Sequence, residues 1–217
     1  KQNVKIIGTD PGISAEFNGG THMSMEDIGV LRSIPEIVIF EPTDNIQLKK
    51  ALPQIVNYYG VVYIRTFRKN TPDIFDENCD FDLFKAAKIT EGKDLSIFCS
   101  GIMVNETLIA NEKLKSMGID AEIINIHTIK PIDKAAVVAS ARKTGAVLTV
   151  ENHSVIGGLK SAVCEVLMEE FPVPLRAVGV QDKFGQVGKM PYLKEQYNMQ
   201  AEDIVKKAIE VLAAKNN

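Results

Sequence analysis

The stretch NGGTHMSMED, residues 18–27, joins a glycine-rich loop to the predicted start of a helix and presents His22 at that junction. Its two glycines permit backbone angles that side chains forbid, and Ser24, followed by acidic residues, is typical of a helix N-terminus. Apolar residues then recur at helical spacing until Pro35 ends the pattern. An imidazole near the positive end of a helix is well placed to meet an anionic or polar substrate, so His22 is the first candidate for chemistry. The alternative is that His22 only satisfies a loop hydrogen bond.

The sequence on both sides of this stretch alternates between strand and helix patterns. Strands are predicted at residues 4–7, 36–40 and 61–65, helices at about 24–32 and 46–56, and a long loop at 8–20. Such alternation predicts parallel strands joined by crossover helices, and ligands of these sheets bind outside the carboxyl ends of the strands. We therefore expect residues 1–70 to form an incomplete parallel-sheet half-domain.

Residues 71–90 are rich in acidic side chains without a period, which indicates a linker. A second α/β unit is predicted at residues 91–217. Its strands are predicted at 95–99, 121–126, 147–151 and 174–178, and its helices at 104–117, 134–143, 158–171 and 201–214. Gly118 and Gly145 follow predicted helices at the position where glycine commonly stops them. This unit is predicted to be a three-layer α/β/α domain.

The composition excludes several classes of protein. With 217 residues, a net charge of −3 and 45% hydrophobic residues, the chain can bury a sizeable core but carries no basic footprint for nucleic acid or an anionic membrane. No apolar run reaches the ~20 residues that span a bilayer, and no secretion signal is present, so a cytoplasmic protein is expected. The three cysteines are far apart, without metal-binding spacing.

Other polar residues follow predicted strands. Arg68 could bind a phosphate through two parallel hydrogen bonds, although an arginine after a strand is more often a solvated surface group. The pair Gly157-Gly158 could form a phosphate nest, but a tight turn is the preferred interpretation. For His127 and His153 we favour structural hydrogen bonds to loop backbone, with a role at a subunit interface as the second interpretation.

Several ordered motifs resemble the transketolase family. The segments GTDPGIS (8–14), GTH (20–22) and PTD (42–44) are similar to the later half of its pyrimidine-binding domain. The segments IHTIKPID (126–133) and ENHSVIGGL (151–159) are similar to the transketolase C-terminal domain. The resemblance covers nearly the whole chain.

This resemblance implies thiamine diphosphate with Mg²⁺ or Ca²⁺, held between chains of a dimer, and transfer of a two-carbon ketol unit from a ketose phosphate to an aldose phosphate. It implies that His22 is the active-site histidine near cofactor and donor hydroxyls, and that Arg68 binds the substrate phosphate. The implied partners are N-terminal transketolase domains or a separate subunit, in a homodimer or heterotetramer.

Two departures from the family pattern concern the substrate. Asp10 stands where the family usually has a histidine near the substrate phosphate, and Asn18 stands where it usually has an aspartate near an acceptor hydroxyl. Because Asp10 brings like charge toward a dianion, we expect an altered sugar, or one with its anionic group elsewhere, rather than an ordinary pentose phosphate.

Two family features lie outside this sequence: the glutamate that activates the cofactor, and the Gly-Asp-Gly metal motif. The sequence also begins at Lys1 and enters a strand almost at once. We therefore expect a C-terminal fragment or subunit that alone is inactive and binds no cofactor tightly. The alternatives are a 1-deoxyxylulose-5-phosphate synthase or 2-oxo acid dehydrogenase β-type subunit, and a non-catalytic assembly or dimerisation module.

Overall fold

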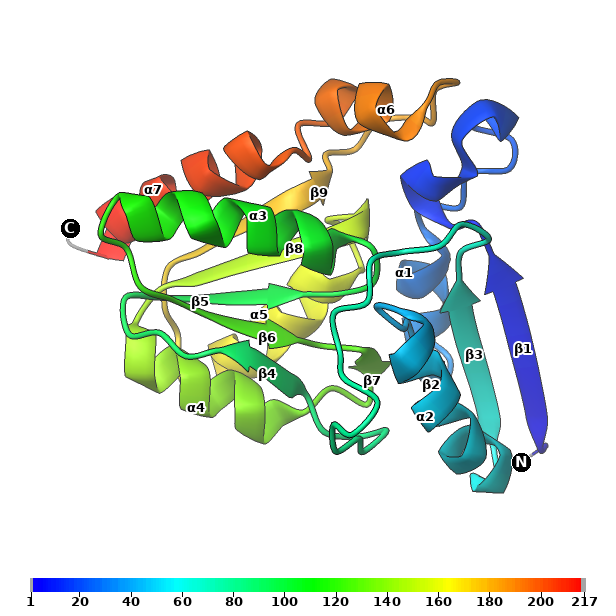
Figure 1. Ribbon diagram of the computed structural model, residues 1–217. Coiled ribbons are helices and arrows are strands. Elements are labelled where there is room, and N and C mark those ends of the chain that lie inside the picture. Colours follow the sequence, from blue (N-terminus) through cyan, green and yellow to red (C-terminus); the bar gives the residue numbers. More distant parts are fainter. Residues whose placement is uncertain (1, 216–217) are drawn as a thin grey trace.

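The computed structural model describes residues 2–215, which form two β-sheets lying side by side with helices on their faces (Figure 1). The strands of the first sheet are β1 (Val4–Thr9), β2 (Val38–Phe40), β3 (Val61–Thr66) and β7 (Thr128–Lys130). They are arranged in the order β1-β3-β2-β7. The first three strands are parallel, as predicted, and β1 forms one edge of the sheet.

The strand β3 shows why this sheet carries helices on both faces. Successive side chains of a strand point to opposite sides, so Val62 and Ile64 pack with α2 (Asn45–Asn57), whereas Tyr63 packs on the opposite side, in the cluster of Ile28 from α1 (Asp27–Arg32). The helix α2 begins with a side-chain cap, because the Asp44 carboxylate accepts a hydrogen bond of 2.8 Å from the backbone N–H of Gln47.

The start of α1 differs from the prediction. The helix begins at Asp27, and its N-cap residue Glu26 makes no side-chain capping hydrogen bond. The predicted cap Ser24 lies outside the helix, and its carbonyl accepts a hydrogen bond of 2.7 Å from the backbone N–H of Gly12. Ser24 therefore makes a tertiary contact with the long loop and does not cap the helix.

The second sheet has five strands in the order β4-β6-β5-β8-β9. They are β4 (Ala87–Thr90), β5 (Leu95–Cys99), β6 (Ala121–Asn125), β8 (Val147–Ser154) and β9 (Leu175–Val180). Figure 1 shows α3 (Met103–Ser116) and α7 (Ala201–Lys215) on one face, and α4 (Lys134–Thr144) and α5 (Leu159–Glu170) on the other. The expectation of a three-layer domain is confirmed.

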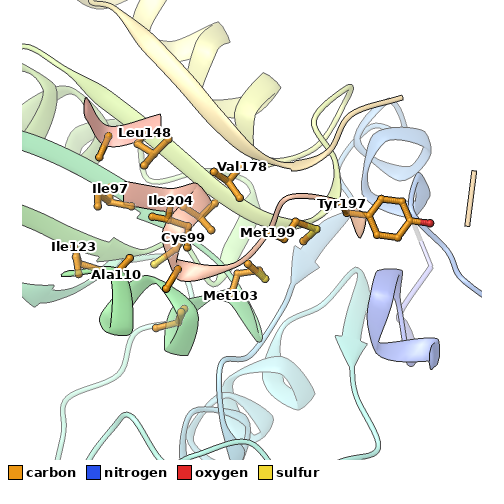
Figure 2. Packing of buried hydrophobic residues seen from close by; sticks show 14 of the residues in the cluster. Ile97, Cys99, Met103, Ala110, Ile123, Leu148, Val178, Tyr197, Met199 and Ile204 are labelled. Atoms are coloured by element: carbon orange, nitrogen blue, oxygen red, sulfur yellow. The ribbon is translucent and has the colours of Figure 1, made fainter. Parts of the chain in front are cut away.

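The larger of the two core clusters of this domain lies between the sheet and the pair α3 and α7, and the other lies under α4 and α5. Figure 2 shows Ile97, Ile123 and Leu148 from three neighbouring strands beside Ile204 of α7. All four side chains are buried. Because burial of such a side chain contributes about 1.5–3 kcal/mol, this layer supplies much of the driving force for folding.

Three short elements escape the sequence prediction. The strand β4 lies inside the predicted linker and pairs antiparallel with β6, and α6 (Met190–Gln196) precedes the final helix. The strand β7 leaves the second unit and pairs antiparallel with β2 of the first sheet. The two units are thus joined by backbone hydrogen bonds. No helix within residues 2–215 is long and apolar enough to cross a membrane.

Candidate functional site

Two predicted site residues meet at the carboxyl edge of the first sheet. The parallel register places Thr9 of β1 beside Thr66 of β3, so the residues that follow both strands emerge together. The Asp10 carboxylate accepts a hydrogen bond of 2.9 Å from the backbone N–H of Arg68 and also pairs with the Arg68 guanidinium. The Asp10 side chain is 7% exposed and that of Arg68 is 66% exposed. A buried acid therefore lies beneath an exposed base.

The long loop after β1 is clamped against the second unit. It contains the 3-10 segment η1 (Gly12–Asn18), which lies beside α6 in Figure 1. The Asn152 side chain, at the end of β8, accepts a hydrogen bond of 2.9 Å from the backbone N–H of Ile13 and donates one of 2.9 Å to the carbonyl of Pro11. Gly12 has φ +56°, and a Cβ atom there would lie 2.3 Å from Asn152 Oδ1. Only glycine fits this contact without strain.

His22 lies in an exposed turn rather than at a helix end. Its backbone N–H donates to the carbonyl of Gly19 at 3.0 Å, and its Nδ1 lies 2.9 Å from Thr21 Oγ1. The predicted position near the positive end of a helix is wrong, because α1 begins only at Asp27. Met23, the next residue, is buried in the core of the second unit, which anchors the turn and leaves the imidazole outside.

Asn18 is also exposed, at the end of η1. Within the described chain, no hydrogen bond or ion pair links His22 or Asn18 to Asp10 or Arg68. The structure thus brings Asp10 and Arg68 together and places the other two predicted residues further along the same loop.

A cavity of about 230 Å³ opens beside Asp10, between the two units. Its lining includes Glu16 of the loop, Lys69, which follows Arg68, and Lys194 of α6. The Glu16 carboxylate pairs with Lys69 and accepts a hydrogen bond of 3.1 Å from the backbone N–H of Met190. The pKa of Glu16 is lowered, chiefly because Lys69 donates a hydrogen bond to it. Glu16 and Lys69 were not predicted from the sequence, where their only signal is that they lie close to Asp10 and Arg68 in the chain.

Behind this edge, Arg65 forms a buried ionic network. Its Nε donates to Asp27 at 2.8 Å, its Nη1 pairs with Glu41, and its Nη2 donates to the carbonyl of Asn152 at 2.9 Å. Burial raises the pKa of Asp27, but the charge and hydrogen bonds of Arg65 outweigh it, and the pKa lies below its ordinary value. The network fixes β3, α1, β2 and β8 relative to one another.

The remaining histidines have structural hydrogen bonds, as we favoured. His127 Nε2 lies 2.8 Å from the carbonyl of Lys85, and His153 Nδ1 lies 2.6 Å from the carbonyl of Ser154. Burial lowers the pKa of each to about 4, so both are neutral at pH 7.

The turn at Gly157-Gly158 leads into α5, whose first backbone N–H groups already donate to the side chain of Glu151. Buried Glu151 accepts hydrogen bonds from the backbone N–H groups of Leu159 at 2.6 Å and Lys160 at 3.0 Å. Burial raises the pKa of Glu151 to about 8, and its side chain already accepts the backbone N–H groups that a phosphate would need, which favours the tight-turn interpretation over a phosphate nest.

Two juxtaposed α/β sheets, with a polar loop clamped between them at the carboxyl ends of β1 and β3, define a two-unit α/β protein with its candidate site at that edge. Residues 1–73 match the family described as transketolase, pyrimidine binding domain, and residues 85–204 match transketolase, C-terminal domain. The chain belongs to the transketolase family.

Two of its relatives are named as parts of larger transketolases. The chain is 54% identical over 214 residues to the 6-deoxy-6-sulfo-D-fructose transketolase subunit SqwH of Clostridium sp. (strain MSTE9), covering 99% of this chain and 66% of the relative. It is 38% identical to a subunit of the apulose-4-phosphate transketolase of Phocaeicola vulgatus, covering 97% of this chain and 67% of the relative.

A solved structure has the same fold. A split-gene transketolase, described as an inactive beta4 tetramer, superimposes with a TM-score of 0.88 at 38% identity, covering 98% of this chain and 67% of that one. The chain therefore spans about two-thirds of the length of the relatives that it matches.

Proposed function

We propose that this chain acts as part of a transketolase, transferring a two-carbon ketol unit between sugars together with an N-terminal transketolase segment or subunit. The observation that carries this proposal is the match of two consecutive transketolase domains across nearly the whole chain. The subunit names of the relatives and the split-gene neighbour support a partner chain.

Family membership implies thiamine diphosphate and a divalent metal in the complete enzyme, and we propose that other segments hold them. Among residues 2–215 no group of three or more His, Cys, Asp or Glu side chains could hold a metal ion. This set of donor side chains does not fit the metal that accompanies the cofactor's diphosphate.

For His22 we propose a role in holding donor hydroxyls and moving protons. The support is its position: the imidazole is exposed, its turn is anchored by buried Met23 and Met25, and Nδ1 is engaged by Thr21. Thr21 engages Nδ1, which leaves Nε2 of the exposed imidazole for the substrate. A positioned histidine typically contributes 10²–10⁴-fold to such proton transfers.

As donor substrate we propose a sulfonated ketose such as 6-deoxy-6-sulfo-D-fructose. The support is the name of the relative at 54% identity, which exceeds the 38% identity to the relative named for apulose 4-phosphate. The presence of Asp10 where a phosphate neighbour was expected agrees with an altered anionic group.

The test is ketol transfer by the chain reconstituted with the N-terminal transketolase segment or subunit of the same organism. The sulfonated ketose is the donor, and the aldose product is quantified. We expect transfer by the complex, and a loss of about 100-fold or more in kcat for His22→Ala without a change in melting temperature. Glu112→Ala, an exposed change on α3, serves as the control. No transfer from any ketose by the unmodified complex would overturn the proposed function, and full activity of His22→Ala would remove only the role of His22.

A further inference from the structure

Two ion pairs with the same arrangement lie at the candidate site, at the carboxyl edge of the first sheet. Asp10 pairs with Arg68, and Glu16 pairs with Lys69. In both pairs the acid is buried, with side-chain exposures of 7% and 11%, and the base is exposed, at 66% and 68%. Asp10, Glu16 and Lys69 also line the cavity between the two units. A ligand that approaches this edge therefore meets Arg68 and Lys69, whose positive charges are already balanced by the buried carboxylates of Asp10 and Glu16.

The geometry shows that the acids are fixed rather than incidental. Asp10 is held by the backbone N–H of Arg68 at 2.9 Å, and its own backbone N–H donates to the carbonyl of Thr66 at 2.8 Å. Glu16 is held by the backbone N–H of Met190 at 3.1 Å as well as by Lys69. Neither carboxylate can swing away from the edge without losing a backbone hydrogen bond.

These four side chains sum to zero charge, which matters for the choice of anion. The terminal phosphate of a sugar carries about −1.5 to −2 charges at pH 7, whereas a sulfonate carries one. Both groups are tetrahedral and offer three acceptor oxygens, so the remaining guanidinium N–H groups of Arg68 can donate to either. Because Coulomb repulsion scales with charge, each buried carboxylate repels a dianion up to twice as strongly as a monoanion.

We propose that Asp10 and Glu16 are specificity-determining residues, which select a ketose with a monoanionic terminal group such as a sulfonate over the corresponding dianionic phosphate. This inference rests on the proposed function. It assigns the discrimination to charge supplied by two buried acids, rather than to the shape of the cavity.

The experiment compares two donors with the same carbon skeleton, 6-deoxy-6-sulfo-D-fructose and fructose 6-phosphate, in the reconstituted complex. We expect the unmodified complex to prefer the sulfonate. In Asp10→Asn, which keeps a hydrogen-bond acceptor and removes the charge, the ratio of kcat/KM for phosphate over sulfonate should rise about 10-fold, mostly through KM for the phosphate. Glu16→Gln should shift the ratio in the same direction.

Asp73→Asn is the matched control, because it removes the charge of an exposed carboxylate next to the cavity-lining residues Pro72 and Ile74. Its ratio should equal that of the unmodified complex. Transfer from the sulfonate, combined with an unchanged ratio in both Asp10→Asn and Glu16→Gln, would overturn the inference while leaving the proposed function intact. An equal loss on both donors would also overturn it, because it would indicate a purely structural role. Inactivity of the unmodified complex with either donor would instead contradict the proposed function.

Discussion

Replacing Arg65 by methionine should destabilise the chain strongly at neutral pH. The Arg65 side chain is fully buried and serves two carboxylates, Glu41 at 0% and Asp27 at 9% side-chain exposure. Removing one partner of a buried ion pair typically costs 3–5 kcal/mol, because it leaves an uncompensated charge. Each carboxylate keeps one neutral donor here, Ser100 Oγ at 2.7 Å for Glu41 and Tyr63 Oη at 2.8 Å for Asp27. We therefore expect a loss of about 4 kcal/mol in the free energy of unfolding.

The measurement is urea unfolding followed by circular dichroism at pH 7 and at pH 4. Without the guanidinium, burial raises the pKa of Asp27 in the folded state, so the folded variant binds a proton as the pH falls. Its deficit should therefore shrink between pH 7 and pH 4. Arg68→Met is the control, since its exposed ion pair should contribute no more than about 1 kcal/mol. A deficit for Arg65→Met below that of the control, or one that does not shrink at pH 4, would refute this account of the network.

Two further predictions concern stability. Burial lowers the pKa of His127 to about 4 in the folded chain, so the unfolded chain binds a proton at this group at higher pH than the folded chain does. The free energy of unfolding should therefore fall by up to about 3 kcal/mol from this group as the pH falls from about 6.5 to 4. In His127→Gln the free energy of unfolding should depend less on pH over this range. An unchanged dependence on pH would contradict the lowered pKa of His127. Gly12→Ala should cost at least about 2 kcal/mol, because its φ is positive and the new Cβ meets Asn152. Thermal unfolding measures this loss. The control is Gly118→Ala, where φ is +77° but no atom lies within 4 Å of the new Cβ, so that its cost reports the backbone strain without a steric clash.

The longer elements could be predicted because their local patterns agree with their tertiary surroundings. The strand at 95–99 has the predicted bounds, and Gly145 ends α4 in the left-handed conformation. The strand β7 and the helix α6 could not be predicted in this way. The strand β7 has three residues, and the helix α6 has seven with a proline in its first turn. Segments this short carry too little periodicity for a prediction, and their structure depends on partners that are distant in sequence.

The candidate site was predictable in position but not in electrostatics. Arg68 was expected just beyond the end of a parallel strand, and the structure places Asp10 beside it at the carboxyl edge of the first sheet. Their mutual pairing, and that of Glu16 with Lys69, depends on which side chains the loop buries. The backbone of that loop is held by Asn152, which is distant in sequence, so local patterns do not predict these pairs. For His22, the pattern around Ser24 suggested a cap, but the backbone of Ser24 bonds to the loop instead.

The crossing strand β7 also has a consequence for the order of events during synthesis. The ribosome delivers the first unit early, yet β2 obtains its second neighbour only when residues 128–130 have been made. Until then its free edge is exposed to other nascent chains, and contacts between residues so distant in sequence form slowly. The first sheet can therefore be completed only after β5 and β6 of the second unit have been synthesised, and we expect a stalled or truncated product that lacks β7 to aggregate more readily than the full chain.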